Sequence, residues 1–116
     1  MRVEMSRPVY LCTEPTDLRK SINGLASLVE SQLGLEVLSG GLFAFTNRSK
    51  RLIKILYWDR NGFCLWMKRL EKDRFVWPQT HQKSVSLKPR ELEWLLEGLD
   101  FEKMTPHSVL HFEQFC

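Results

Sequence analysis

The stretch from Leu42 to Leu70 constrains the fold most, because it contains three aromatic and β-branched runs of strand length. These runs are Leu42–Phe45, Leu52–Trp58 and Phe63–Leu70. The segment Asp59-Arg60-Asn61-Gly62 separates the last two runs, and its Asn-Gly pair is a strong hairpin signal. Either a tight type I′ turn or a type I turn with a glycine bulge fits this segment. The pattern predicts an antiparallel meander.

The run Leu52–Trp58 is apolar on both of its alternating faces, which is typical of a central strand that is covered on both sides. Arg74–Trp77 predicts a further strand, which Pro78 would end. Val9–Cys12 is a short apolar run followed by turn residues and predicts another strand. We therefore expect an antiparallel sheet of four to five strands, with a meander centred on residues 42–77.

Two amphipathic helices are expected, one near each end of the chain. Apolar residues recur at helical spacing over about 17–33, after a Pro15-Thr16-Asp17 start, and Gly24 within that helix suggests close approach to a strand. The second helix covers about 89–98 and has Pro89 at its first position, although Lys88 is a poor N-cap. The fold class predicted is α+β.

The chain has 116 residues, which suits one domain over residues 1–100 followed by a tail over 101–116 that could pack on it. No apolar run approaches the roughly 20 residues that cross a bilayer, and the N-terminus lacks a signal-peptide core. Three cysteines without a Cys-x-x-Cys pair suggest reduced thiols. We expect a cytoplasmic protein with no membrane contact and no cofactor.

Charge is distributed unevenly along the chain, although the net charge is only +3. Residues 48–74 carry nine basic side chains against three acidic ones, whereas residues 88–116 carry three basic against six acidic. The basic residues of the first segment are Arg48, Lys50, Arg51, Lys54, Arg60, Lys68, Arg69, Lys72 and Arg74. Such a segment favours contact with nucleic-acid phosphates. The alternative is a solvated sheet face whose residues Trp58, Trp66 and Trp77 are core.

Arg19 and Lys20 lie near the expected start of the first helix, where the helix dipole disfavours cations. They could form a second patch for DNA or an acidic partner. Equally, either could pair with Asp17 or Glu30. The sequence leaves both interpretations open.

Catalysis is not expected from this sequence. Asp17, Asp59 and Asp100 are the candidates for a two-metal site, but each is explained by a helix end or a turn. His107 and His111 stand four residues apart near Cys116, without a recognised metal-binding motif. We therefore predict no enzyme activity and no metal site.

Three ordered blocks resemble a known family. The first block is Pro15-Thr16-Asp17-Leu18-Arg19-Lys20 with Gly24-Leu25. The second runs from Ile53-Lys54-Ile55-Leu56-Tyr57-Trp58-Asp59 through Gly62-Phe63-Cys64-Leu65 and Lys68-Arg69-Leu70-Glu71 to Phe75-Val76-Trp77-Pro78. The third is Leu95-Leu96-Glu97-Gly98-Leu99-Asp100. Together they are similar to TnpB, an accessory protein of the sixty-six family of bacterial insertion sequences.

The resemblance implies a protein encoded beside a transposase that supports DNA recombination by the mobile element, while the transposase itself cuts and joins strands. The basic segment, with Arg19 and Lys20, suggests that this accessory protein binds DNA through an antiparallel hairpin. The alternative is a module that docks on the transposase or another element-encoded protein, with Trp94 as its anchor.

Overall fold

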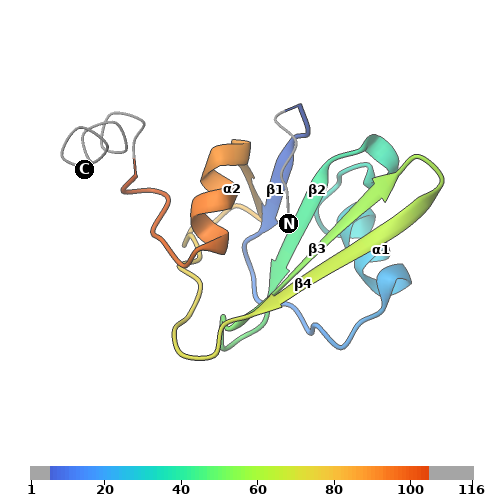
Figure 1. The fold of residues 1–116 in the computed structure, drawn as a ribbon. Helices are drawn as coiled ribbons and strands as arrows, with labels where there is room; N and C mark the ends of the chain where they lie inside the picture. Colours follow the sequence, from blue (N-terminus) through green and yellow to red (C-terminus); the bar gives the residue numbers. More distant parts are fainter. Residues whose placement is uncertain (1–5, 105–116) are drawn as a thin grey trace.

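The computed structural model describes residues 6–104, which form a five-stranded sheet with one helix on each face (Figure 1). The strands are β1 (Val9–Cys12), β2 (Leu42–Thr46), β3 (Leu52–Asp59), β4 (Gly62–Arg69) and β5 (Ser84–Leu87). The helices are α1 (Ile22–Ser31) and α2 (Pro89–Leu96), with a short 3-10 helix at Val37–Ser39. The strand order across the sheet is β4-β3-β2-β1-β5. The α+β class, the strand number and the two helices are confirmed.

The sheet is mostly antiparallel, but β1 and β2 run parallel, with Val9 opposite Leu42. A parallel pair needs a crossover, and α1 provides it on one face of the sheet. The β2–β3 and β3–β4 pairs form the predicted meander. The sequence pattern did not show that the N-terminal strand would lie beside β2 in the same direction.

Two predicted elements differ from the structure between β4 and α2. The expected strand at Arg74–Trp77 is wrong, because residues 70–83 have no regular secondary structure. Phe75 and Trp77 nevertheless enter the core, which explains their apolar pattern. The strand beside β1 is instead β5, whose Ser84–Leu87 sequence is too polar to stand out.

Helix α1 begins at Ile22, five residues after the predicted start. Thr16 N–H donates to Thr46 O at 2.8 Å, so the segment before the helix is tied to the end of β2. Gly24 also has a different neighbour from the one expected, since a Cβ there would meet Lys20 Cβ at 3.2 Å rather than a strand. Helix α2 matches its prediction, and Glu91 Oε1 accepts from Lys88 N–H at 2.8 Å, which compensates for the poor N-cap.

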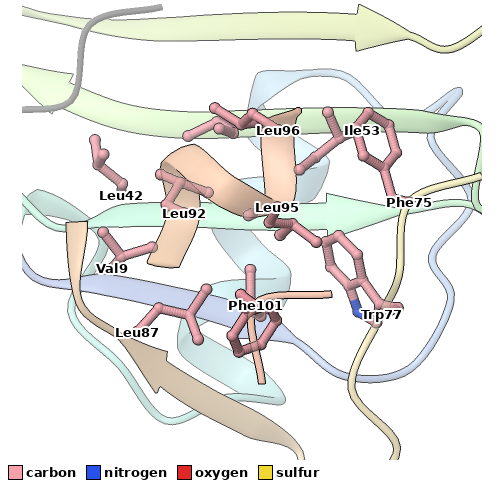
Figure 2. Close-up of a cluster of buried hydrophobic side chains, with 13 residues drawn as sticks. Val9, Leu42, Ile53, Phe75, Trp77, Leu87, Leu92, Leu95, Leu96 and Phe101 are labelled. Atoms are coloured by element: carbon pink, nitrogen blue, oxygen red, sulfur yellow. The ribbon is translucent and has the colours of Figure 1, made fainter. Parts of the chain in front are cut away.

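Each face of the sheet carries its own apolar cluster, because successive strand residues point to opposite faces. On one face, Leu92 and Leu95 of α2 lie over β1, β2 and β3 (Figure 2). On the other face, Leu25 and Val29 of α1 cover Leu56 and its neighbours. Strand β3 is central and covered on both faces, as predicted.

The β3–β4 hairpin has the predicted position but a different turn. Asp59 pairs with Gly62, which leaves a two-residue loop. Arg60 has φ +53°, whereas Asn61 is not among the residues with positive φ. A type I′ turn requires positive φ at both loop residues, and a glycine bulge requires it at the glycine, so neither predicted turn is present.

The tryptophans are mainly structural. Trp77 is buried, while Trp58 and Trp66 are half-buried, and Trp58 lies edge-on to Phe63 with 5.0 Å between ring centroids. Phe101, at the start of the predicted tail, is buried in the cluster beneath α2. Residues 105–116 lie outside the described part of the chain.

Candidate nucleic-acid interface

Three segments that are distant in sequence meet at one end of the sheet. The C-terminal ends of β1, β2 and β4 lie at this end of the sheet, together with the N-terminal ends of β3 and β5. The segments are 13–21, 47–51 and 70–83, which lie along the lower edge of the sheet in Figure 1. Backbone hydrogen bonds join them, including Phe75 N–H to Lys50 O at 2.7 Å and Thr13 N–H to Lys83 O at 3.1 Å. We call this the basic end.

The basic end combines cations that the sequence presents as separate groups. It carries Arg19, Lys20, Arg48, Lys50, Arg51, Lys72, Arg74 and Lys83. The acidic residues of the same segments are Glu14, Asp17, Glu71 and Asp73. Eight cations against four acids leave this end positive. Lys83 was missed from the sequence because the strand that follows it was not predicted.

Most of these cations have no internal partner. Within residues 6–104, no ion pair or side-chain hydrogen bond engages seven of them, namely Lys20, Arg48, Lys50, Arg51, Lys72, Arg74 and Lys83. Six of the seven are exposed, and Lys50 is half-buried. Folding therefore leaves their charge available to a ligand.

The turn after β2 presents three of these cations close together. Lys50 N–H donates to Asn47 O at 3.0 Å, and the Asn47 side chain accepts from Ser49 Oγ at 3.2 Å and Leu52 N–H at 3.4 Å. Lys50 has φ +61°, which reverses the chain toward β3. Arg48 and Arg51 on either side are exposed. The turn is thus ordered by its backbone and Asn47, not by its cations.

Arg19 is different, because it forms a two-pronged ion pair with Asp17. Its Nε lies 2.9 Å from Asp17 Oδ1, and its Nη2 lies 2.8 Å from Asp17 Oδ2. These bonds hold the pKa of Asp17 well below its usual value and raise the pKa of Arg19. Of the two interpretations left open for Arg19, the structure shows the local ion pair. Lys20 has no such partner within the described residues.

The remaining predicted cations lie along the β3–β4 hairpin and act within the molecule. Lys54 Nζ donates to Leu18 O on the α1 side, and Lys68 Nζ donates to Leu96 O at 2.8 Å on the α2 side. Arg69 pairs with Glu71 at 3.1 Å. Arg60 lies 3.9 Å from Asp59 at the opposite end of the sheet. The hairpin therefore does not present one continuous row of free cations.

Comparison with known proteins identifies the family. Residues 7–106 match the family described as IS66 Orf2 like protein. The chain belongs to this family. It is 40% identical over 93 residues to the uncharacterized protein y4hO of Sinorhizobium fredii, covering 80% of this chain and 81% of the relative. The uncharacterized protein y4jC of the same organism is 31% identical over 101 residues, covering 87% and 86%. No solved structure matches the chain.

Membership of the IS66 Orf2 like family confirms the resemblance seen in the sequence. The family comprises insertion-sequence accessory proteins that are distinct from the transposase. The match includes all three segments of the basic end. The structural features of that end therefore belong to the family domain and not to an appended sequence.

Two shallow hollows flank the Pro15–Asp17 segment of this IS66 Orf2 like protein. One, of about 430 Å³, lies between this segment and the 47–52 turn, with Arg19 and Arg48 in its lining. The other, of about 360 Å³, is lined by Lys20 and Lys83. Asp17 lines both hollows, so each combines positive and negative groups. The basic end is consequently an open, uneven surface.

Residues considered for other chemistries do not come together. Asp17 is at the basic end, Asp59 is at the opposite end, and Asp100 follows α2. Within residues 6–104, no three His, Cys, Asp or Glu side chains gather to hold a metal ion. Burial raises the pKa of the Cys12 thiol, which disfavours the thiolate. The pair His107 and His111 lies outside the described residues.

Trp94, the predicted anchor for a protein partner, lies in α2. Trp94 is half-buried and packs against the cluster beneath α2, so only part of its ring is available to a partner.

Neither α1 nor α2 has the length and apolar character needed to cross a bilayer, and no other helix of residues 6–104 does.

Proposed function

We propose that this insertion-sequence accessory protein binds DNA through its basic end, without catalysing strand cleavage itself. The observation that carries the proposal is the convergence of seven unpartnered cations from three separate segments at one end of the sheet. Lysine and arginine bind phosphates with release of counterions, and this gives affinity without base recognition. The protein would act in the bacterial cytoplasm, where the element's DNA lies.

The surroundings of these cations favour backbone contact over base stacking. Phe75 and Trp77, the aromatic residues of the 70–83 segment, are buried in the core. Single-strand binding usually relies on exposed aromatic side chains. Within the described residues of the basic end, the exposed groups are mainly charged or polar. The proposal is therefore duplex binding through phosphates, with Arg48, Lys50 and Arg51 at its centre.

The test is duplex binding measured at several salt concentrations. A triple variant with Arg48→Gln, Lys50→Asn and Arg51→Gln removes three charges, and asparagine tolerates the positive φ of Lys50. We expect weaker binding and a salt slope reduced by about one unit per lost contact. An unchanged slope in this variant would refute the proposal.

A matched control removes the same charge from the opposite end. The variant Arg60→Asn, Lys88→Gln and Arg90→Gln also loses three cations, but these residues lie beyond the far ends of β3 and β5. Its salt slope should match that of the unmodified protein. An equal loss in both variants would show that net charge, and not the basic end, determines binding.

The second candidate function is docking on the transposase. Helix α2 supports it, because part of Trp94 is accessible beside the exposed carboxylates Glu93 and Glu97. Partial burial of an aromatic side chain is compatible with an interface anchor. Capture of the transposase that survives high salt and is lost with Trp94→Ala would support docking, whereas capture unaffected by that change would exclude Trp94 as the anchor.

A further inference from the structure

The outer edge of β4 is long and apolar. The strand has eight residues and pairs with β3 on one side, while no strand of residues 6–104 pairs with its other side. Its five central residues, Phe63 to Met67, include no charge and no proline. Natural edge strands are normally shortened, charged or interrupted, because free N–H and C=O groups invite pairing with another strand.

The opposite edge of the same sheet shows the usual protection. Strand β5 has only four residues, of which two are serines, and Lys83 and Lys88 flank it. By contrast, Met67 on β4 is 61% exposed, a high value for a large apolar side chain. The two edges of one sheet therefore differ in the features that prevent association.

We propose that β4 pairs with β4 of a second copy of this chain, antiparallel and about a two-fold axis at Leu65. In this register, Phe63 faces Met67 of the second copy, Cys64 faces its Trp66, and Leu65 faces its own equivalent. Every position from Phe63 to Met67 then has an apolar partner on the same face of the sheet. A two-fold interface requires such self-complementarity.

Charge selects this arrangement over a parallel one. The cations of β4, Lys68 and Arg69, are both at its C-terminal end. Parallel pairing would place them beside the same cations of the second copy, which is unfavourable. Antiparallel pairing separates them and places Lys68 and Arg69 opposite the uncharged residues Gly62 and Asn61 of the other copy, where Asp59 already pairs with Arg7 and Arg60. The occupant best suited to this edge is therefore another β4.

The interface is limited to one strand from each copy. Stable complexes usually bury about 1,600 Å² in total, and edge pairing of two eight-residue strands provides less. We therefore expect a reversible, concentration-dependent dimer. Dimerisation through β4 does not require DNA. A failure to dimerise would therefore leave the proposed DNA binding unaffected.

Sedimentation equilibrium of the full chain without DNA tests this proposal. The unmodified protein should show a monomer–dimer equilibrium, and Met67→Lys should shift it to monomer, because the introduced lysine of each copy would then face the apolar Phe63 of the other copy. Leu38→Lys is the matched control, since Leu38 is 59% exposed but lies in the 3-10 helix. It should dimerise normally. Circular dichroism should show that both variants are folded.

Three results would overturn the proposal. These are a protein that stays monomeric at every accessible concentration, a Met67→Lys variant that dimerises normally, and equal loss of dimer in the folded Leu38→Lys variant. A monomeric protein whose β4 edge instead captured the transposase would assign the edge to that partner and would also refute self-association.

Cross-linking tests the register. In a chain carrying Cys64→Ser and Cys116→Ser, Leu65→Cys places two cysteines opposite each other, and mild oxidation should give a disulfide-linked dimer. Met67→Cys should not cross-link, because the two cysteines would stand about 13 Å apart along the strands. Efficient cross-linking through Met67→Cys, without cross-linking through Leu65→Cys, would refute this register.

Discussion

Lys50 and Arg60 are the two residues other than glycine that have positive φ within residues 6–104. Both are cations in turns, Lys50 between β2 and β3 and Arg60 between β3 and β4. The Asn-Gly pair correctly located the β3–β4 turn, but Arg60, which precedes that pair, adopts the left-handed conformation. Asn61 N–H donates to Asp59 O across it. Left-handed backbone is unfavourable for a residue with a Cβ, so Arg60 carries local strain.

Relief of that strain gives a stability prediction. Arg60→Gly should raise the free energy of unfolding by about 1 kcal/mol, because glycine tolerates positive φ. The substitution also removes the ion pair between Arg60 and Asp59. This pair contributes little to stability, because its atoms are 3.9 Å apart and the Arg60 side chain is exposed. Urea denaturation would measure the change.

Asn61→Gly is the control for this prediction. Its φ is not positive, so glycine there only adds flexibility to the unfolded chain and should lower stability by about 0.5–1 kcal/mol. Equal effects of the two substitutions would contradict the strain at Arg60.

At the scale of elements, the β3–β4 hairpin connects the two helical layers. Lys54 reaches the segment before α1, and Lys68 reaches the last turn of α2, each through its amino group and a backbone carbonyl. The final carbonyls of a helix lack partners within the helix, and a cation there is also favoured by the helix dipole. The sequence showed these lysines only as part of a basic segment, because their acceptors are 36 and 28 residues away.

This arrangement distinguishes a structural lysine from a DNA-binding one. Lys68→Met keeps most of the apolar stem but removes the amino group, and should lower the free energy of unfolding by about 1–2 kcal/mol. DNA affinity at a temperature where the variant is folded should change little. Thermal unfolding and duplex binding would measure the two quantities.

Lys72→Met is the matched substitution at the basic end. Lys72 is exposed and has no partner within residues 6–104, so its loss should leave stability unchanged and weaken DNA binding. If the effects of the two substitutions were reversed, the assigned roles of both lysines would be wrong.

At the scale of the whole molecule, residues 70–83 hold the sheet and α2 together. They connect β4 with β5, which lie at opposite edges of the sheet, and they run without regular secondary structure. Trp77 fixes their path, since its Nε1 donates to Cys12 O at 2.9 Å and its ring lies in the same apolar cluster as Leu95 of α2 (Figure 2). Lys72, Arg74 and Lys83 lie in the same segment, which the Phe75 and Lys83 backbone bonds join to the rest of the basic end.

Trp77→Phe should lower the free energy of unfolding by about 2 kcal/mol, because it leaves a buried carbonyl without this donor and creates a cavity. The loss should be measured by urea denaturation followed by circular dichroism. Trp58→Phe is a suitable comparison, because Trp58 is half-buried. A loss at Trp77 no larger than that at Trp58 would argue against a special role for the buried hydrogen bond.

The sequence by itself determined the elements whose signals are local. These are the β3–β4 hairpin, the central position of β3, both helices and the family. It also showed that cations are concentrated between residues 48 and 74. Such features depend on turn chemistry and on periodicities of two or 3.6 residues, which neighbouring residues are sufficient to encode.

Only the tertiary structure decided which segments meet. The parallel pairing of β1 with β2, the short β5 and the late start of α1 all depend on contacts between residues far apart in sequence. The same contacts divided the cations into those that stabilise the fold, such as Lys54 and Lys68, and those that remain free at the basic end. Charge along the chain is set by sequence, but whether a cation has a partner depends on distances that exist only after folding.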